Sequence, residues 1–283
     1  MNFKKYDIIA IVGPTAVGKT KFSIELAGQI DGEVINGDAT QIYRKLDIGS
    51  AKVTTAEMNG IEHHLIDIKN PDEQYTVADF QRDARAKIAE IQAKGKTPII
   101  CGGSGLYIQS VLFDYNFDKQ FDKSSSKYNE FDDNKILEEY QNLYPTNPDN
   151  IDIHNPSRVR NYLVRKELGI EEEANGKTPY YDNFKIIGIT CERSLLHERI
   201  GLRVDQMIEQ GLVDEVKQFK QEDPSQTAIG YKEIHQYLNG EISLDRAVEL
   251  VKRNTRRFAK RQYTWFNNKM EVTWYDSVED KWL

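Results

Sequence analysis

The chain has 283 residues, with 38 Lys and Arg against 45 Asp and Glu, and a formal net charge of -7 at pH 7. This length suits one large domain or a core domain that carries an insertion, and the composition is that of a globular protein. The negative charge excludes a basic coat over the whole surface, although a local basic face can still attract a polyanion.

No apolar run is long enough to span a membrane, and the run Ile8–Val12 is too short for the core of a signal peptide. The two cysteines, Cys101 and Cys191, each lie in or beside an apolar, strand-like run, which favours buried thiols over a disulfide. We therefore expect a cytoplasmic protein without a membrane partner.

The first motif lies between a predicted strand, Ile8–Val12, and a run with helical spacing, and it reads GPTAVGKT. This pattern in this context is typical of a phosphate-binding loop, where backbone N–H groups and a helix N-terminus hold an anion. Lys19 would neutralise the outer phosphate, and the Thr20 hydroxyl would bind Mg²⁺. The predicted diphosphate ligands are Gly13, Pro14, Thr15, Ala16, Val17, Gly18, Lys19 and Thr20.

A second short strand is predicted at Glu33–Asn36, and Asp38 follows it. The carboxyl ends of parallel strands meet at one edge of a sheet, so Asp38 should lie near the phosphate loop. An Asp in this position can also cap a turn. Both interpretations stand, and we favour the functional one.

A further short strand is predicted at Glu62–Ile68 and contains His63 and His64. Paired histidines can bind a metal, but no other ligand has suitable spacing nearby. We therefore favour a packing role for both.

The run from Tyr75 to Lys94 predicts a helix with Thr76 as its N-cap, and Thr97–Cys101 predicts a buried strand. A second glycine-rich turn, Gly102–Tyr107, opens another helix. The alternation of strands and helices predicts an α/β fold with a P-loop NTPase-like, three-layer core and a parallel sheet.

The composition becomes polar and turn-rich between residues 113 and 183, with two helices predicted at Asp132–Leu143 and Ser157–Leu168. We therefore expect a core made of residues 1–112 and 184–283, and a mainly helical insertion at 113–183.

The core resumes with a predicted strand at Phe184–Thr190 and a helix at Leu195–Phe219, interrupted at Gly211. Arg199 and Arg203 share a face of this helix.

Ser243 caps a final predicted helix that carries two parallel cationic rows. Such rows are either a solvated face or a surface for a polyanion, and their geometry on an acidic protein favours the polyanion. The rows are Lys252, Arg256 and Lys260, and beside them Arg253, Arg257 and Arg261.

Three function classes fit a phosphate loop. An ATP-binding kinase or NTPase needs a Mg²⁺-holding acid after a second strand, but Cys101 is followed by glycines. In a transferase with diphosphate as leaving group, Asp38 is the base for the nucleophile, while Lys19, Thr20, Arg203 and Mg²⁺ absorb the charge of the leaving group. A nucleotide-switched RNA-binding module is the third class.

The chain resembles the tRNA dimethylallyltransferases of bacterial type, also called tRNA isopentenyltransferases. The similar segments follow the family's order along nearly the whole chain, and the ordered set is highly specific. They are GPTAVGKT (13–20), DATQIY (38–43), DIGSAK (47–52), HHLID (63–67), GGSGLY (102–107), AIGYKE (228–233) and TRRFAKRQYTW (255–265).

The resemblance implies transfer of a dimethylallyl group from dimethylallyl diphosphate to the N6 amine of the adenosine 3′ to the anticodon, in tRNAs that read codons beginning with U. It implies Asp38 and Arg203 as catalytic residues and an insertion that contacts the anticodon stem. With the loop motif, we expect Thr20 as a third catalytic residue and Mg²⁺ as cofactor; we also expect a monomer. The implied tRNA contacts are Asp38, Ala39, Thr40, Gln41, Ser104, Arg158, Arg160, Arg253, Arg256 and Arg257.

Three positions depart from the family's pattern. Ala39 replaces a Ser, and Ser104 stands where a Thr is usual. The family commonly has Arg-Val-x-Arg where this chain has Arg158, Val159, Arg160 and Asn161, so the second arginine stands one position earlier.

Overall fold

The computed structural model describes residues 3–117, 125–169 and 177–278. The chain divides into two compact units, one formed by Met1–Phe113 and Pro179–Leu283, the other by Asp114–Thr178. We describe each unit by itself.

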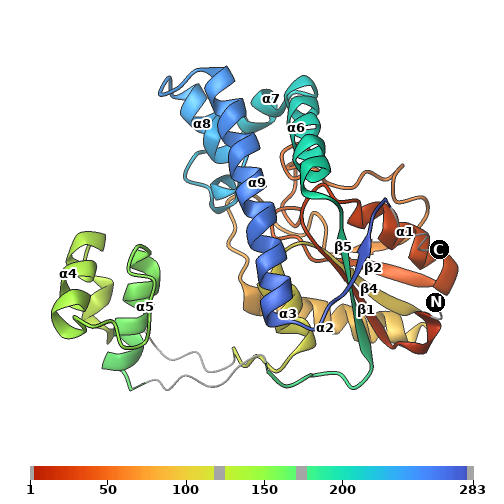
Figure 1. Ribbon diagram of the computed structural model, residues 1–283, viewed down its shortest axis with the longest axis horizontal. Coiled ribbons are helices and arrows are strands. Elements are labelled where there is room, and N and C mark those ends of the chain that lie inside the picture. Colours follow the sequence, from red (N-terminus) through yellow and green to blue (C-terminus); the bar gives the residue numbers. More distant parts are fainter. Residues whose placement is uncertain (1–2, 118–124, 170–176, 279–283) are drawn as a thin grey trace. The chain divides into compact units, whose positions relative to one another are not determined.

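In the described part of the first unit, six parallel strands form one sheet in the order β3-β2-β4-β1-β5-β6 (Figure 1). This confirms the predicted parallel sheet. The strands are β1 (Ile8–Val12), β2 (Gly32–Asn36), β3 (His63–His64), β4 (Thr97–Cys101), β5 (Phe184–Thr190) and β6 (Thr273–Asp276).

Helices cover both faces of this sheet. Along β1, Ile9 and Ile11 pack on one face with the buried side chains of α1, whereas Ile8, Ala10 and Val12 pack on the other face with those of α2 and α3. The alternation follows from the two-residue period of a strand. The predicted three-layer core is therefore confirmed. The helices of this unit are α1 (Lys19–Ile30), α2 (Val77–Ala93), α3 (Gly105–Leu112), α6 (Arg193–Glu209), α7 (Leu212–Val216), α8 (Tyr231–Leu238) and α9 (Leu244–Lys269).

Most predicted boundaries agree with the structure. Helix α2 begins after Thr76, which forms the expected capping box with Asp79. The helix predicted at 195–219 is two helices, α6 and α7, because Gly211 adopts a φ of 99° and caps the second one.

The strand predicted at Glu62–Ile68 is much shorter, with only His63 and His64 in the ladder. Leu65 and Asp67 have φ values of 59° and 56°, which end the extended conformation. The sheet also gains β6, a strand that the sequence pattern did not predict.

Helix α9 lies against α3, α6 and α8 (Figure 1). Ser243 caps its N-terminus, and Val251, Gln262 and Phe266 are buried on its inner side. One face of this long helix therefore reaches the core, while much of the rest stays exposed.

The second unit contains α4 (Asp133–Leu143) and α5 (Pro156–Glu167), which pack around the buried Tyr140 and Leu163. Both helices were predicted. The Arg160 guanidinium of α5 donates to the carbonyl oxygens of Tyr128 and Phe131 at 2.5 and 2.6 Å.

The compact second unit is shorter than the predicted insertion at 113–183. Residues 179–183 group with the first unit, since the Tyr180 N–H donates to the Leu112 carbonyl at 2.9 Å. The Arg85 guanidinium also lies 3.5 Å from the centre of the Tyr180 ring.

The turns after β2 and β4 touch through glycine. A Cβ atom at Gly102 would lie 2.1 Å from the Gly37 carbonyl oxygen, whereas one at Gly28 in α1 would have no neighbour within 4 Å.

We expect Gly102→Ala to lower the free energy of unfolding by about 2 kcal/mol or more, because the backbone of Gly37 cannot move aside as a flexible side chain can. Gly28→Ala should raise it by about 0.5–1 kcal/mol. Urea denaturation measures both; equal stabilities would contradict this account of the turn.

Candidate active site

The phosphate loop lies between β1 and α1, as predicted. Gly13 has a φ of 140°, and a Cβ atom there would lie 2.4 Å from the Ile189 carbonyl oxygen of β5. Gly18, with a φ of 105°, caps α1. Both positions require glycine for conformational reasons, and together they set the shape of the loop.

Lys19 begins α1, and its Nζ donates to the Pro14 carbonyl at 2.8 Å. Burial lowers the pKa of Lys19 to about 8; Cys101 and Asp38 oppose this effect, and Arg203 adds to it. An ammonium that is costly to keep charged gains most from a bound anion.

A second cation, Arg203 of α6, lies beside the loop. Its Nη1 is 3.4 Å from the Thr15 hydroxyl oxygen. Burial lowers the pKa of Arg203, and the negative charges of Asp38 and Glu57 oppose that shift. A guanidinium stays charged even so, so two positive charges converge on the loop.

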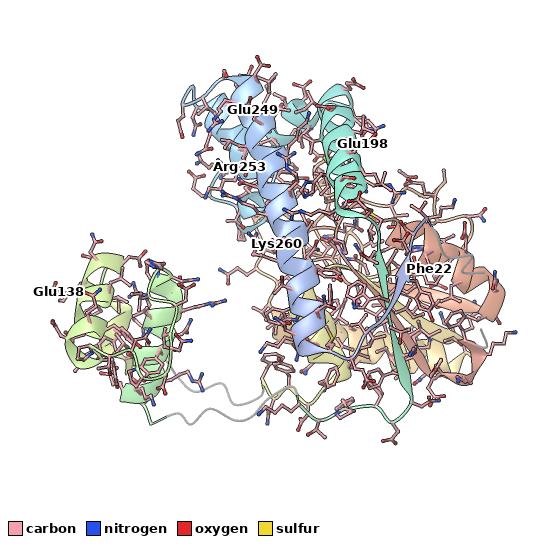
Figure 2. All side chains as sticks on the ribbon, in the orientation of Figure 1. Phe22, Glu138, Glu198, Glu249, Arg253 and Lys260 are labelled. Carbon is pink, nitrogen blue, oxygen red and sulfur yellow. The ribbon has the colours of Figure 1, made fainter. Side chains whose placement is uncertain are left out.

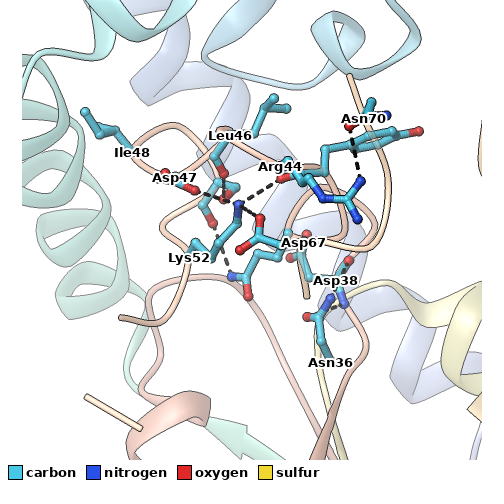
Figure 3. Close-up of polar contacts among 12 residues, drawn as sticks. Asn36, Asp38, Arg44, Leu46, Asp47, Ile48, Lys52, Asp67 and Asn70 are labelled. Carbon is cyan, nitrogen blue, oxygen red and sulfur yellow. Dashed lines mark hydrogen bonds and ion pairs between the residues drawn. The ribbon is translucent and has the colours of Figure 1, made fainter. Parts of the chain in front are cut away.

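Asp38 follows β2 and holds the next turn. One of its carboxylate oxygens accepts the Thr40 N–H at 2.8 Å. The Asn36 side chain bonds to the Asp38 N–H and carbonyl at 3.0 and 3.1 Å (Figure 3), and the Ser104 hydroxyl accepts the Ala39 N–H at 3.1 Å. Asp38 is thus a turn cap, and the same bonds orient its carboxylate.

Two cavities meet at Asp38. The first, about 720 Å³, contains Lys19 and Thr20 of the phosphate loop. The second, about 500 Å³, is lined by aromatic side chains, among them Tyr107 and Phe258. The residues that line both cavities are Thr15, Asp38, Ser50, Ala51 and Arg203.

The segment that carries Ser50 and Ala51 is held by polar contacts. Lys52 Nζ bonds to the carboxylates of Asp47 and Asp67, each at 2.6 Å (Figure 3). The Gln41 amide donates to the carbonyls of Ser50 and Ala51 at 3.3 and 3.2 Å. Gln41 therefore supports the cavity wall; its predicted contact with tRNA stays a prediction.

Glu215 of α7 is a site residue that the sequence analysis missed. Its buried carboxylate accepts the N–H groups of Asp47, Ile48 and Gly49 at 2.9, 2.7 and 3.0 Å, and the Tyr231 hydroxyl at 2.7 Å. The one signal in the sequence was the position of this acid, which directly precedes Val216 in a short, largely apolar helix. Glu215 holds the other end of the same wall.

Gln262 of α9 is the second missed residue, because its helical spacing placed it with the apolar face. It accepts the Thr15 N–H at 2.9 Å and donates to the Gly103 carbonyl at 3.0 Å. The last helix therefore reaches the phosphate loop directly.

The two cationic rows of α9 are not equivalent. Lys252 pairs with Asp205 at 2.6 Å, and Arg261 lines the second cavity. Arg253 and Lys260 are exposed (Figure 2). Arg257 is also exposed, and Arg256 is half-buried.

Of the two histidines in β3, His64 has a structural role, because it contacts a buried acid. His64 Nε2 lies 2.8 Å from the buried Glu33 carboxylate, which Lys94 and Lys96 also approach to 3.0 Å. Burial alone would raise the pKa of Glu33, but these hydrogen bonds outweigh it and lower the pKa to about 2. Glu62 lies near enough to complete a three-ligand group, yet the lysines already neutralise Glu33.

A profile described as IPP transferase matches residues 41–269. The chain belongs to the IPP transferase family. It is 46% identical to a tRNA dimethylallyltransferase of Bacillus pumilus, over 98% of this chain and 91% of that protein. It is 48% identical to one of Bacillus cereus (strain ATCC 14579), over 96% and 90% of the two chains.

Solved structures of IPP transferases are also similar. The full-length tRNA isopentenylpyrophosphate transferase of Bacillus halodurans has a TM-score of 0.74 and 42% identity, covering 98% of this chain and 92% of that one. A eukaryotic dimethylallyltransferase acting on tRNA has a TM-score of 0.73 and 27% identity, covering 96% and 74%.

The predicted tRNA contacts lie in both units. Ala39, Thr40 and Ser104 line the second cavity or its rim. In the other unit, Arg158 is exposed, whereas Arg160 is engaged by backbone carbonyls. The contacts of both arginines with tRNA stay predictions.

None of the helices in the described part of the chain combines the length and the apolar character that crossing a membrane requires.

The pKa of Lys19 generates a test. Lys19 is charged below pH 8 and loses its charge as the pH rises through about 8. The affinity for inorganic pyrophosphate should therefore fall roughly tenfold from pH 7 to 9, relative to a Lys19→Arg variant whose guanidinium stays charged. Isothermal titration calorimetry measures the ratio at each pH. A ratio that does not change with pH would remove Lys19 from anion binding.

Proposed function

We propose the following reaction for this tRNA prenyltransferase. A dimethylallyl group passes from dimethylallyl diphosphate to the exocyclic N6 amine of an adenosine in tRNA, and diphosphate is released. The adenosine is the one on the 3′ side of the anticodon, in tRNAs that read codons beginning with U. The names of the relatives support the prenylation of tRNA.

The observation that carries this proposal is the position of Asp38 and Arg203 on the border of two cavities. The first cavity holds the phosphate loop and suits the diphosphate of the donor. The second has aromatic walls and suits a base. An adenine in a stacked anticodon loop cannot be reached, so it must leave the stack to enter this cavity.

The chemistry follows from the charges at the border. The N6 nitrogen attacks C1 of the donor, the bond between C1 and the diphosphate oxygen breaks, and Asp38 accepts the N6 proton. Lys19 and Arg203 neutralise the negative charge that develops on the leaving diphosphate.

Mg²⁺ is the proposed cofactor. The hydroxyl of the exposed Thr20 lines the first cavity beside Lys19, and oxygen ligands are those that Mg²⁺ prefers. When bound, the ion would add positive charge beside the diphosphate oxygens.

The remaining expectations concern the whole molecule. We propose that the protein acts as a monomer, and a tRNA substrate accords with a cytoplasmic location. We propose that the second unit, 114–178, contacts the anticodon stem through residues such as Arg158.

A kinase or NTPase is disfavoured by the strand next to β1. Strand β4 pairs with β1 and ends at Cys101, after which Gly102 and Gly103 provide no carboxylate for Mg²⁺.

Labelled dimethylallyl diphosphate and unmodified tRNA test the reaction and the base together. The wild-type protein should transfer label to tRNA without ATP. Asp38→Asn keeps an oxygen for the Thr40 N–H but is a poor base, so we expect kcat to fall about 10²–10⁴-fold while tRNA still binds. ATP turnover without transfer would favour the kinase, and a wild-type kcat in Asp38→Asn would exclude Asp38 as base.

The basic face of α9 is tested by charge reversal. Arg253→Glu combined with Arg257→Glu should weaken tRNA binding and flatten its dependence on salt, because fewer counterions are released. Filter binding at several salt concentrations measures the slope. The matched control reverses Arg82 and Lys87 of α2, which already pair with acids. The same slope in both double variants would make the α9 face merely solvated.

A further inference from the structure

Gln262 joins three segments that are distant in sequence. The residue is 5% exposed and lies in the C-terminal half of α9. Oε1 accepts the Thr15 N–H at 2.9 Å, and Nε2 donates to the Gly103 carbonyl at 3.0 Å. A Cβ atom at Gly103 would lie 2.1 Å from Nε2, so glycine is what allows the amide to approach.

The Thr15 N–H belongs to the same peptide group as the Pro14 carbonyl. In a trans peptide these two groups point in opposite directions from one plane. Fixing the N–H on Gln262 therefore fixes the direction of the carbonyl, and that carbonyl is the one that accepts Lys19 Nζ at 2.8 Å.

Thr15 also supports the second cation, since its hydroxyl oxygen lies 3.4 Å from Arg203 Nη1. The two cations that face the phosphate loop thus share one support, the Pro14–Thr15 segment. Gln262 is the side chain that holds this segment from α9.

We propose that Gln262 is a positioning residue for the diphosphate of the donor. It orients the Pro14–Thr15 peptide, and through it the Lys19 ammonium and the Arg203 guanidinium, toward the anion. This inference deepens the proposed function and rests on it. Gln262 acts through its neighbours and takes no part in bond making.

The chemistry of the side chain makes the proposal specific. One side chain must accept the Thr15 N–H and donate to the Gly103 carbonyl, and an amide group can do both. Leucine has a similar size and provides neither. A glutamate keeps the acceptor but places a negative charge against the Gly103 carbonyl, and only its protonated form can donate.

The experiment measures affinity for inorganic pyrophosphate with Mg²⁺ by calorimetry, and affinity for tRNA by filter binding. We expect Gln262→Leu to weaken pyrophosphate binding about tenfold, as loss of a buried hydrogen-bonded support implies, with tRNA affinity within twofold of wild type. Gln262→Glu should be weaker still at pH 8, and its deficit relative to wild type should shrink at pH 6 as the carboxyl group protonates.

Asn268→Leu is the matched control, an exposed amide on the same helix, and it should leave both affinities unchanged. Wild-type pyrophosphate affinity in Gln262→Leu and Gln262→Glu would overturn the positioning role. Equal losses of pyrophosphate and tRNA affinity, with a lower Tm, would also overturn it and indicate general support of the fold. If the wild-type protein itself fails to bind pyrophosphate, the proposed function fails instead.

Discussion

The cost of holding two cations in a partly buried cavity governs the rest of the site. Burial lowers the pKa of both Lys19 and Arg203, and nearby Asp38 opposes the shift of each. Such charges persist only where protein oxygens orient them and a bound anion can compensate them. The Pro14 carbonyl and the Thr15 hydroxyl are such oxygens, and in the proposed reaction the donor diphosphate is the anion.

Around Lys19 and Arg203, buried polar side chains form hydrogen bonds with the backbone groups of the loops. Glu215 accepts three consecutive N–H groups, Asn36 holds both backbone groups of Asp38, and Gln262 bonds to two glycine-rich turns. Unpaired backbone groups are costly inside a protein, so each of these side chains stabilises one conformation of its loop. These bonds orient the backbone at the border between the cavities.

The local pattern predicted much of what is seen. The phosphate loop, the parallel sheet, the capping box of α2 and the break at Gly211 all depend on short-range rules of period, turn and cap. The strand at Glu62–Ile68 was predicted too long, because the positive φ values of Leu65 and Asp67 arise where that segment crosses toward the site. Hydrophobic period alone does not encode such a turn.

By itself, the sequence determined the order of the elements, the glycine-rich loop between the first strand and the first helix, and the acid that follows the second strand. These are properties of neighbouring residues, and the resemblance to a family added their roles. Only the tertiary structure decided that Gln262 and Glu215 belong to the site, since each acts across more than 160 residues of chain. A long-range hydrogen bond leaves no periodic trace in the sequence, because its partner is selected by packing.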